Sequence, residues 1–322
     1  MTVRADGVSV IIPTWKGARY LPALIAGLRS QSLPPDEIVV IDSSSPDGSA
    51  DLARTLGCTV EVIPQSEFNH GGTRNRAVMA ITAGTLVFLT QDALPADEKF
   101  LANLVRPIGE DGIAATYARQ VAHPGATPPE RMARDRNYPA TSAVHRAEDI
   151  GRLGVRAYFF SNVASAFSRE AFTAIGGFPD DVIMNEDMVA AARLLHGGRA
   201  VVYCAEAVVH HSHNYSLRQQ FRRYFDIGVF FREHGHLLPG AATGGEGVRF
   251  AIAQIGWLLK RGHLLWALRS PWESLAKFAG FHLGRGHRHL PRGVVRACSM
   301  HAFHFDRICS RLPTSAGRQG AG

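Results

Sequence analysis

Three short stretches of the chain carry charged side chains whose types and spacing suit chemistry on a ligand. They are the strand-like run that ends in Asp92, the acidic triplet at residues 185–187, and the histidine cluster at residues 210–213. Carboxylates bind hard cations or accept protons, and histidines ligate metals near neutral pH. Each stretch becomes useful only if the fold brings it to a ligand.

Asp92 and Asp42 each follow a predicted strand. The apolar run at residues 85–90 precedes Asp92, and residues 37–41 precede Asp42. Open α/β sheets bind ligands just beyond the carboxyl ends of their strands, so both are candidate ligand contacts. Asp42 would suit a base or ribose. Aspartate is also a common turn residue, and the two positions taken alone leave that alternative open.

Asn185, Glu186 and Asp187 open a predicted helix that reaches His196. Acids in a first helical turn complement the helix dipole, which is a purely structural use. A carboxylate held on a rigid helix could equally accept a proton from a substrate hydroxyl. The spacing alone leaves both uses open.

His210, His211 and His213 end a strand-like run. Alternation along a strand places His211 and His213 on one face and His210 on the other. Two histidines on one face can ligate a metal or bind a diphosphate, whereas a lone histidine there would more often be structural.

The elements around these groups alternate between strand and helix. Strands are predicted at residues 8–13, 37–41, 59–63 and 85–90, which favours a doubly wound, largely parallel sheet. Residues 119–160, rich in proline and charge, predict a long functional loop or lid. Residues 200–204 and 207–213 predict two short strands, and helices follow from Leu217. We expect residues 311–322 to be disordered.

The composition is that of a globular protein, with 46% hydrophobic and 20% charged residues in 322. Four scattered cysteines make a zinc site or disulfide framework unexpected and favour a reducing cytosol. No apolar run precedes the first strand, so no signal peptide is expected.

Residues 249–322 carry 12 basic and 2 acidic side chains, which leaves a net charge of −3 for the rest. Such asymmetry points to an anionic membrane or nucleic acid.

Two nucleotide-binding signatures are missing. The loop PTWKGARYLP after the first strand lacks G-x-G-x-x-G, and the chain has no G-x-x-x-x-G-K-[ST]. We therefore expect neither NAD(P) nor ATP held by a phosphate-cradling loop.

The motifs together resemble family two glycosyltransferases of the GT-A fold. The resemblance covers residues 8–224 and rests on VSVIIPTWKGARYL, EIVVIDSSSPDGS, GGTRNRAV, the strand to Asp92, GGFPDDVIMNEDM and the histidine cluster. FNHGGTRN, LTQDA, YARQ, YFFSNVASAF and HHSHNYSLRQQF are similar to the bacterial rhamnosyltransferase branch. Much of the family has D-x-D where this chain has Thr90-Gln91-Asp92.

The resemblance implies a role for each group. Asp92, with His211 and His213, would bind Mg²⁺ or Mn²⁺, and Asp187, beside Glu186, would be the catalytic base of a single displacement with inversion. The nucleotide sugar would contact Pro13, Thr14, Asp42, Ser44, Gly72, Arg74, Asn75 and Gln91.

The resemblance also implies the partners. The donor would be dTDP-rhamnose, and the acceptor a hydroxyl of a cell-surface polysaccharide or a lipid-linked saccharide. Residues 1–240 would form the catalytic domain. Apart from the resemblance, the basic charge of the C-terminal part and the tryptophans at 257, 266 and 272 predict that residues 241–310 are a helical region that binds the inner face of the membrane from the cytoplasm. Packing or subunit contact, and hence a homo-oligomer, is the alternative for that region. Nucleic acid is not expected, because no RNA-binding motif is present.

Two other functions remain as alternatives. A sugar nucleotidyltransferase would open with a glycine-rich, basic signature after its first strand, which PTWKGARYLP lacks. An inactive membrane scaffold would be expected to lose Asp92 or Asp187, and both are present. A transferase of the same fold that uses another nucleotide sugar also remains.

Overall fold

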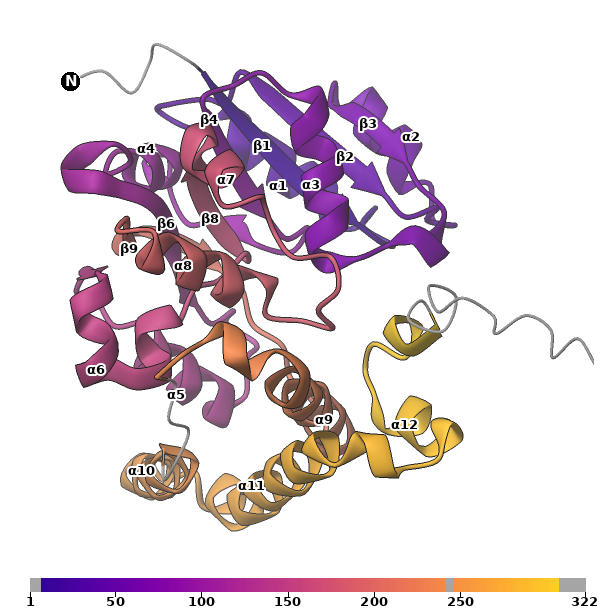
Figure 1. Ribbon diagram of the computed structural model, residues 1–322, viewed down its shortest axis with the longest axis vertical. Helices are drawn as coiled ribbons and strands as arrows, with labels where there is room; N and C mark the ends of the chain where they lie inside the picture. Colours follow the sequence, from indigo (N-terminus) through magenta and orange to yellow (C-terminus); the bar gives the residue numbers. More distant parts are fainter. Residues whose placement is uncertain (1–6, 241–245, 307–322) are drawn as a thin grey trace, which may run out of the picture.

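The computed structural model describes residues 7–240 and 246–306, which form a sheet domain with a group of helices at one end (Figure 1). The nine-stranded sheet has the order β3-β2-β1-β4-β8-β6-β9-β5, with β7 paired to β9. Its strands are β1 (Val8–Thr14), β2 (Glu37–Asp42), β3 (Thr59–Val62), β4 (Thr85–Leu89), β5 (Leu94–Pro95), β6 (Ile113–Val121), β7 (Ala143–His145), β8 (Ala164–Ser168) and β9 (Ala200–His210).

Helices cover both faces of this sheet because the buried strands alternate their side chains between two apolar cores. Val10 and Ile12 of β1 lie in the core under α1 (Leu21–Arg29), α2 (Ser49–Thr55) and α4 (Phe100–Val105). Ile11 lies in the opposite core, under α3 (His70–Ala80), α7 (Arg169–Ala174) and α8 (Glu186–His196). The predicted doubly wound α/β sheet is confirmed.

The sheet departs from a purely parallel pattern at β8. This strand pairs antiparallel with both β4 and β6, and neither β6 nor β8 was expected from the sequence. The two short strands predicted at residues 200–204 and 207–213 are one strand, β9, with an irregular register where Arg119 of β6 meets Val208. His211 and His213 therefore follow the strand instead of belonging to it.

Residues 119–160 are not the irregular loop that the sequence predicted. They contain the end of β6, then α5 (Pro128–Asn137), β7 and α6 (Ile150–Leu153). Tyr138 and Tyr158 are buried in the core, so apolar packing overrides the proline-rich local pattern. The use of residues 119–160 as a lid stays a prediction.

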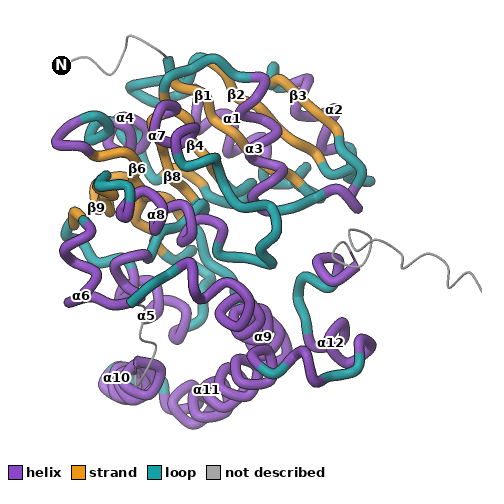
Figure 2. The backbone as a smooth tube through the Cα atoms, viewed as in Figure 1, coloured by secondary structure: helices purple, strands orange, loops and turns teal. Residues whose placement is uncertain are grey.

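The C-terminal part is helical, as expected. It consists of α9 (Leu217–His234), α10 (Glu246–Lys260), α11 (Leu264–Arg285) and α12 (Arg292–Cys298), which lie beyond the end of the sheet (Figures 1 and 2). Of these helices, α10 and α11 contact α5. Ser216 and Gln219 form a capping box that fixes the start of α9 directly after the histidine segment.

Helices α9 and α11 touch backbone to backbone. A side chain at Gly228, Gly280 or Gly284 would lie about 2.0–2.3 Å from a carbonyl oxygen of the other helix. Only glycine permits this approach, so the two helices are held at a fixed distance.

Within the described residues, no helix has the length and apolar character to span a bilayer. The disorder predicted for residues 311–322 lies outside the described residues.

Candidate active site

The loop after β1 has its backbone amides paired with side chains of the protein. The N–H groups of residues 15–18 donate, in order, to the side chains of Gln91, Ser45, Ser49 and Asp47, at 2.9, 2.9, 2.8 and 3.1 Å. These four amides are therefore not presented to a phosphate, which agrees with the missing glycine-rich signature. Negative charge on a ligand must be neutralised elsewhere.

Asp42 is fully buried at the carboxyl end of β2, beside Thr14 of β1. Its Oδ1 accepts a hydrogen bond from the backbone N–H of Ser45 at 2.7 Å. Its Oδ2 is buried and has no hydrogen-bond partner among the described residues. A buried unpaired carboxylate oxygen is costly, so this atom suits a ligand N–H or O–H donor.

Gln91 occupies the middle position of the D-x-D pattern, and Thr90 stands in place of its first aspartate. The Gln91 amide oxygen accepts the N–H of Trp15, and its amide nitrogen donates to the carbonyl of Trp15, both at 2.9 Å. The side chain thus fixes the β1 loop. Its predicted contact with the donor remains a prediction, and the carboxylate that remains for a cation is that of Asp92.

Asp92 faces two histidines. His211 Nε2 lies 3.6 Å from Asp92 Oδ1, and His213 Nε2 lies 3.5 Å from Asp92 Oδ2. These distances exceed those of good hydrogen bonds. They are close to the spacing of about 3 Å between neighbouring ligands around an ion with bonds of about 2.1 Å. Among the described residues, this is the one cluster of three side chains suited to a metal ion.

Gln120, near the end of β6, sets the tautomer of His211. Its amide oxygen lies 3.0 Å from His211 Nδ1 and also accepts a hydrogen bond from Arg134. Because this oxygen can only accept, Nδ1 carries the proton and Nε2 presents its lone pair toward Asp92. The ring is therefore oriented as a metal ligand.

The environment keeps both histidines neutral. Burial, and after it the charge of Arg134, lowers the pKa of His211 well below its ordinary value. Burial also lowers the pKa of His213, although Asp92 acts in the opposite direction. Neutral imidazole is the form that binds a cation.

The second acidic group lies at the start of α8. Asn185 adopts a left-handed backbone conformation, with φ of 63°, and directs Glu186 and Asp187 into the first turn. Asp187 Oδ2 accepts the N–H of Asn162 at 3.0 Å, and Oδ1 accepts that of Met188 at 2.8 Å. Burial, and then the nearby charge of Glu186, raises the pKa of Asp187 to about 7. That value suits a general base at neutral pH.

Glu186 forms an ion pair with Arg74, a residue of α3. Their side chains are 5% and 8% exposed, and Arg74 Nη1 lies 3.2 Å from Glu186 Oε1. The same oxygen accepts a hydrogen bond from the Asn162 side chain at 3.1 Å. Glu186 is thus a buried, paired carboxylate, which leaves Asp187 as the better candidate base.

Two other residues predicted for donor binding serve packing. The amide of Asn75 exchanges two hydrogen bonds with the backbone of Phe178, at 2.7 and 3.0 Å. Gly72 lies under Asn69, whose side chain accepts the N–H of Gly72 at 2.7 Å and caps α3. Direct contacts of these two residues with a donor stay predictions. Pro13 and Ser44 lie at the same strand ends as Asp42, and Ser44 donates to the carbonyl of Ile63 at 2.8 Å.

The segment 161–163 joins the two acidic centres, and the sequence did not single out its residues. Thr90, two residues before Asp92, donates its N–H to Val163 at 3.0 Å, while Asn162 bonds Glu186 and Asp187. Ser161 accepts a hydrogen bond from Gln120 at 2.9 Å. The only signals were the phrases YARQ and YFFSNVASAF, which contain Gln120, Ser161 and Asn162.

The fold and site define a glycosyltransferase. The model of the glycosyl transferase family 2 matches residues 9–176, and the chain belongs to this family. It is 39% identical to the O-antigen chain rhamnosyltransferase RfbN of Salmonella typhimurium, over 94% of this chain and 96% of that protein. It is 38% identical to the O-antigen chain rhamnosyltransferase WbaN of Salmonella anatum, over 93% and 96%.

Solved structures confirm the GT-A fold. The mannosyltransferase PcManGT of Pyrobaculum calidifontis, in complex with GDP-mannose and Mn²⁺, superposes with a TM-score of 0.57 at 20% identity. The match covers 98% of this chain and 89% of the other. Staphylococcus aureus TarS residues 1–349, in complex with UDP-GlcNAc, gives a TM-score of 0.53 at 14% identity, over 88% and 92%.

Proposed function

We propose that this glycosyltransferase moves L-rhamnose from dTDP-rhamnose to a saccharide hydroxyl during O-antigen assembly, with inversion at the anomeric carbon. The sugar and pathway are supported by the two rhamnosyltransferase relatives, which match nearly the full chain. The observation that carries the mechanism is the pair of unlike centres, Asp92 with two neutral histidines and Asp187 with a raised pKa.

Asp187 is the proposed base. Its carboxylate takes the proton of the acceptor hydroxyl while the hydroxyl oxygen bonds to the anomeric carbon. The bond from that carbon to the diphosphate oxygen breaks, and its electron pair leaves with the nucleoside diphosphate. A single displacement of this kind inverts the configuration.

Asp92, His211 and His213 would hold the cation. Mg²⁺ or Mn²⁺ bound there would neutralise the charge that develops on the leaving diphosphate. Two imidazoles and one carboxylate make a mixed N/O ligand set that suits Mn²⁺ at least as well as Mg²⁺. Arg74 is buried against Glu186 and would act on the donor through that pair.

Asp42 would recognise the base. Its unpaired Oδ2 could accept a hydrogen bond from the imide N–H of thymine. We expect Asp42→Asn to weaken binding of dTDP, because an amide offers only one acceptor oxygen where the carboxylate has two.

The experiment that tests this function is a donor panel. The full chain is incubated with Mn²⁺ and dTDP-rhamnose, UDP-glucose or GDP-mannose, and nucleotide release and thermal shift are measured. We expect the largest response with dTDP-rhamnose. A response only to GDP- or UDP-sugars would show that the donor is another nucleotide sugar. Transfer of a nucleotide to a sugar phosphate would show that the enzyme is a nucleotidyltransferase.

The outer face of α10 and α11 supports the proposed membrane partner. Its exposed apolar side chains include Ile252, Leu265, Leu268 and Trp272, which are 67%, 83%, 73% and 64% exposed. The exposed basic residues Lys260 and Arg261 lie at the end of α10 and in the turn that follows it, while the one acid of α11, Glu273, is buried. An apolar face flanked by positive charge suits an anionic bilayer surface.

Vesicle sedimentation tests that partner. We expect more binding to phosphatidylglycerol vesicles than to neutral ones, less at high salt, and loss in Leu265→Glu with Leu268→Glu. Met79→Glu is the matched control, because Met79 is 81% exposed on α3, in the sheet domain. Equal binding to both vesicle types, or unchanged binding of the double variant, would favour a subunit contact instead.

A further inference from the structure

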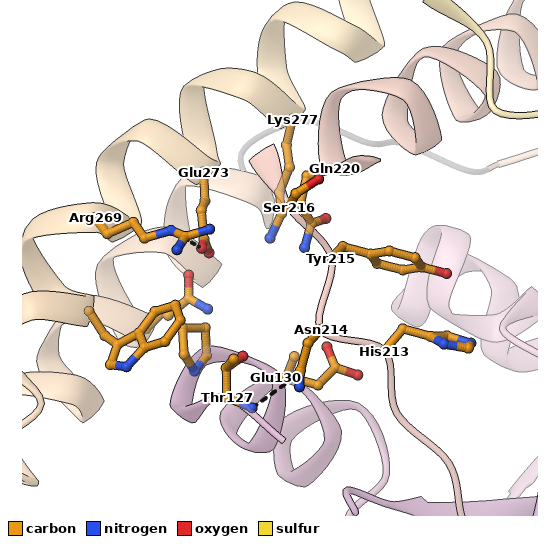
Figure 3. A pocket seen from close by; sticks show the side chains of 14 residues that line it. Thr127, Glu130, His213, Asn214, Tyr215, Ser216, Gln220, Arg269, Glu273 and Lys277 are labelled. Atoms are coloured by element: carbon orange, nitrogen blue, oxygen red, sulfur yellow. Dashed lines mark hydrogen bonds and ion pairs between the residues drawn. The ribbon is translucent and has the colours of Figure 1, made fainter. Parts of the chain in front are cut away.

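A pocket of about 290 Å³ lies between the sheet domain and the C-terminal helices (Figure 3). Residues of α5 form one wall, the segment 213–216 forms the second, and α10 and α11 form the third. Glu130 of α5 and Arg269 and Lys277 of α11 surround one opening in Figure 3. Part of this pocket is therefore built by helices that lie outside the residues matched by the family model.

His213 belongs both to this pocket and to the proposed cation site. The residue lines the pocket, while its side chain reaches the cation site, where Nε2 lies 3.5 Å from Asp92 Oδ2. A ligand in the pocket would consequently lie beside the end of the donor at which the sugar leaves the diphosphate.

The charges that line the pocket balance. Glu273 is buried and pairs with Arg269 at 3.2 Å. Glu130 pairs with Arg134 at 2.7 Å, and the Lys277 ammonium lies 5.8 Å from the centre of the Tyr224 ring. Because the lining contains two acidic and two basic side chains, the pocket has no excess of positive charge that would select an anion.

The remaining lining is mostly amide, hydroxyl and aromatic, and Pro129 and Ala133 are its aliphatic members. The amides include Asn214 and Gln254, and the rings are those of Tyr215 and Trp266. The Arg269 guanidinium lies 5.0 Å from the Trp266 ring centre, which holds that ring in place. Many hydrogen-bonding groups beside rigid aromatic faces, without net charge, suit a neutral polyhydroxylated ligand.

We propose that this pocket binds the acceptor saccharide, a neutral sugar unit, so that α10 and α11 choose which acceptor is glycosylated. The inference rests on the proposed transfer to a saccharide hydroxyl. It adds the location of the acceptor and assigns its recognition to Trp266, Lys277 and neighbouring groups.

Trp266→Ala tests the pocket. We expect the KM for a water-soluble saccharide acceptor to rise about tenfold or more, as for loss of an aromatic anchor. The donor KM, and donor hydrolysis without acceptor, should stay unchanged. Trp266→Phe should retain most of the acceptor affinity, and Lys277→Met, further along the same helix, should also raise the acceptor KM. Melting temperatures show which variants are folded.

Trp272→Ala is the matched control. It makes the same substitution on the same helix, but Trp272 is 64% exposed and does not line the pocket. A soluble acceptor removes any effect of this residue on membrane binding. We expect Trp272→Ala to leave both KM values as in the wild type.

A binding measurement separates this inference from the proposed function. Saturation-transfer NMR with methyl glycosides of glucose, galactose, mannose and rhamnose needs no turnover and is done with dTDP and the diamagnetic ion Mg²⁺ present. Binding of at least one glycoside, lost in Trp266→Ala and kept in Trp272→Ala, supports the pocket even if dTDP-rhamnose is not the donor. Binding that Trp266→Ala leaves unchanged overturns it, as does a pocket that binds inorganic phosphate and no glycoside.

Discussion

Asp92 and Asp187 are the two carboxylates of the proposed mechanism, yet their surroundings give them opposite properties. Asp92 is 18% exposed and faces two imidazoles that burial keeps neutral. Asp187 is held by two backbone N–H groups and stands beside the buried charge of Glu186, which helps to raise its pKa to about 7. The first arrangement suits a cation, and the second suits a proton.

The difference shows that neighbours, and not residue type, divide the work between these two centres. A neutral histidine contributes a lone pair without a repelling charge, so it makes an aspartate part of a cation site. A second carboxylate disfavours ionisation and makes an aspartate a stronger base. Exchanging the neighbours should therefore weaken the distinction between the carboxylate that binds a cation and the carboxylate that accepts a proton.

Removing the cation site should have the largest effect. Asp92→Ala, or excess EDTA, should lower kcat about 10³-fold, since neutralising the leaving diphosphate is worth several kcal/mol. The measurement is nucleotide release with Mn²⁺ or Mg²⁺ restored stepwise. Full activity in EDTA would mean that the histidines and Arg74 stabilise the leaving group without a metal.

Removing the base should cost somewhat less. Asp187→Asn keeps the size of the side chain but cannot accept a proton at neutral pH, so kcat should fall about 10²-fold or more while donor binding persists. In the wild type, kcat should rise with pH up to about 7 as Asp187 ionises. A normal Asp187→Asn enzyme beside an inactive Glu186→Gln enzyme would reassign the base to Glu186.

Altering the residue that orients His211 should have a smaller effect, confined to the cation. Gln120→Leu removes the acceptor for Nδ1–H, so Mn²⁺ affinity should fall about 10- to 100-fold. Gln120→Glu keeps an acceptor oxygen and is the matched control. Calorimetric titration with Mn²⁺ measures both, and equal affinities in the two variants would show that the hydrogen bond does not orient the ring.

The smallest effect should appear in stability. The folded protein holds the Asp187 proton more tightly than the unfolded chain does, because burial and Glu186 raise this pKa above 3.8. The contribution to the free energy of unfolding is therefore full below about pH 4 and is lost as the pH rises to about 7. Urea unfolding at pH 5 and 7.5 should show this loss in the wild type and less of it in Asp187→Asn.

The strands were predictable where burial was continuous, and less so elsewhere. Apolar runs in β1, β2 and β4 point to strands buried on both faces. Ala164–Ser168 of β8 is a short alanine- and serine-containing run without such a signal, and its place between β4 and β6 comes from tertiary pairing. The prediction of a loop at residues 119–160 was wrong because prolines suggest irregular structure, while the burial of Tyr138 and Tyr158 that stabilises this segment is not visible in the sequence.

The candidate site was predictable through its titratable residues, whereas the residues that prepare them were not. Asp92 lies about 120 residues before His211 and His213 in the sequence, and the three side chains meet in the structure as the resemblance implied. Gln120 and Asn162 are neutral amides that look ordinary in a sequence. Their importance comes from the atoms they reach across the sheet, and a one-dimensional pattern does not contain that information.

The paired amides of residues 15–18 have a kinetic consequence. A loop that is already hydrogen-bonded before the donor arrives needs no ordering step during association, so part of the entropic cost of binding is met during folding. Stopped-flow binding of dTDP-rhamnose should then show one phase whose rate rises linearly with concentration. Gln91→Ala frees both backbone groups of Trp15, and a second, concentration-independent phase should appear as the loop searches for its bound conformation.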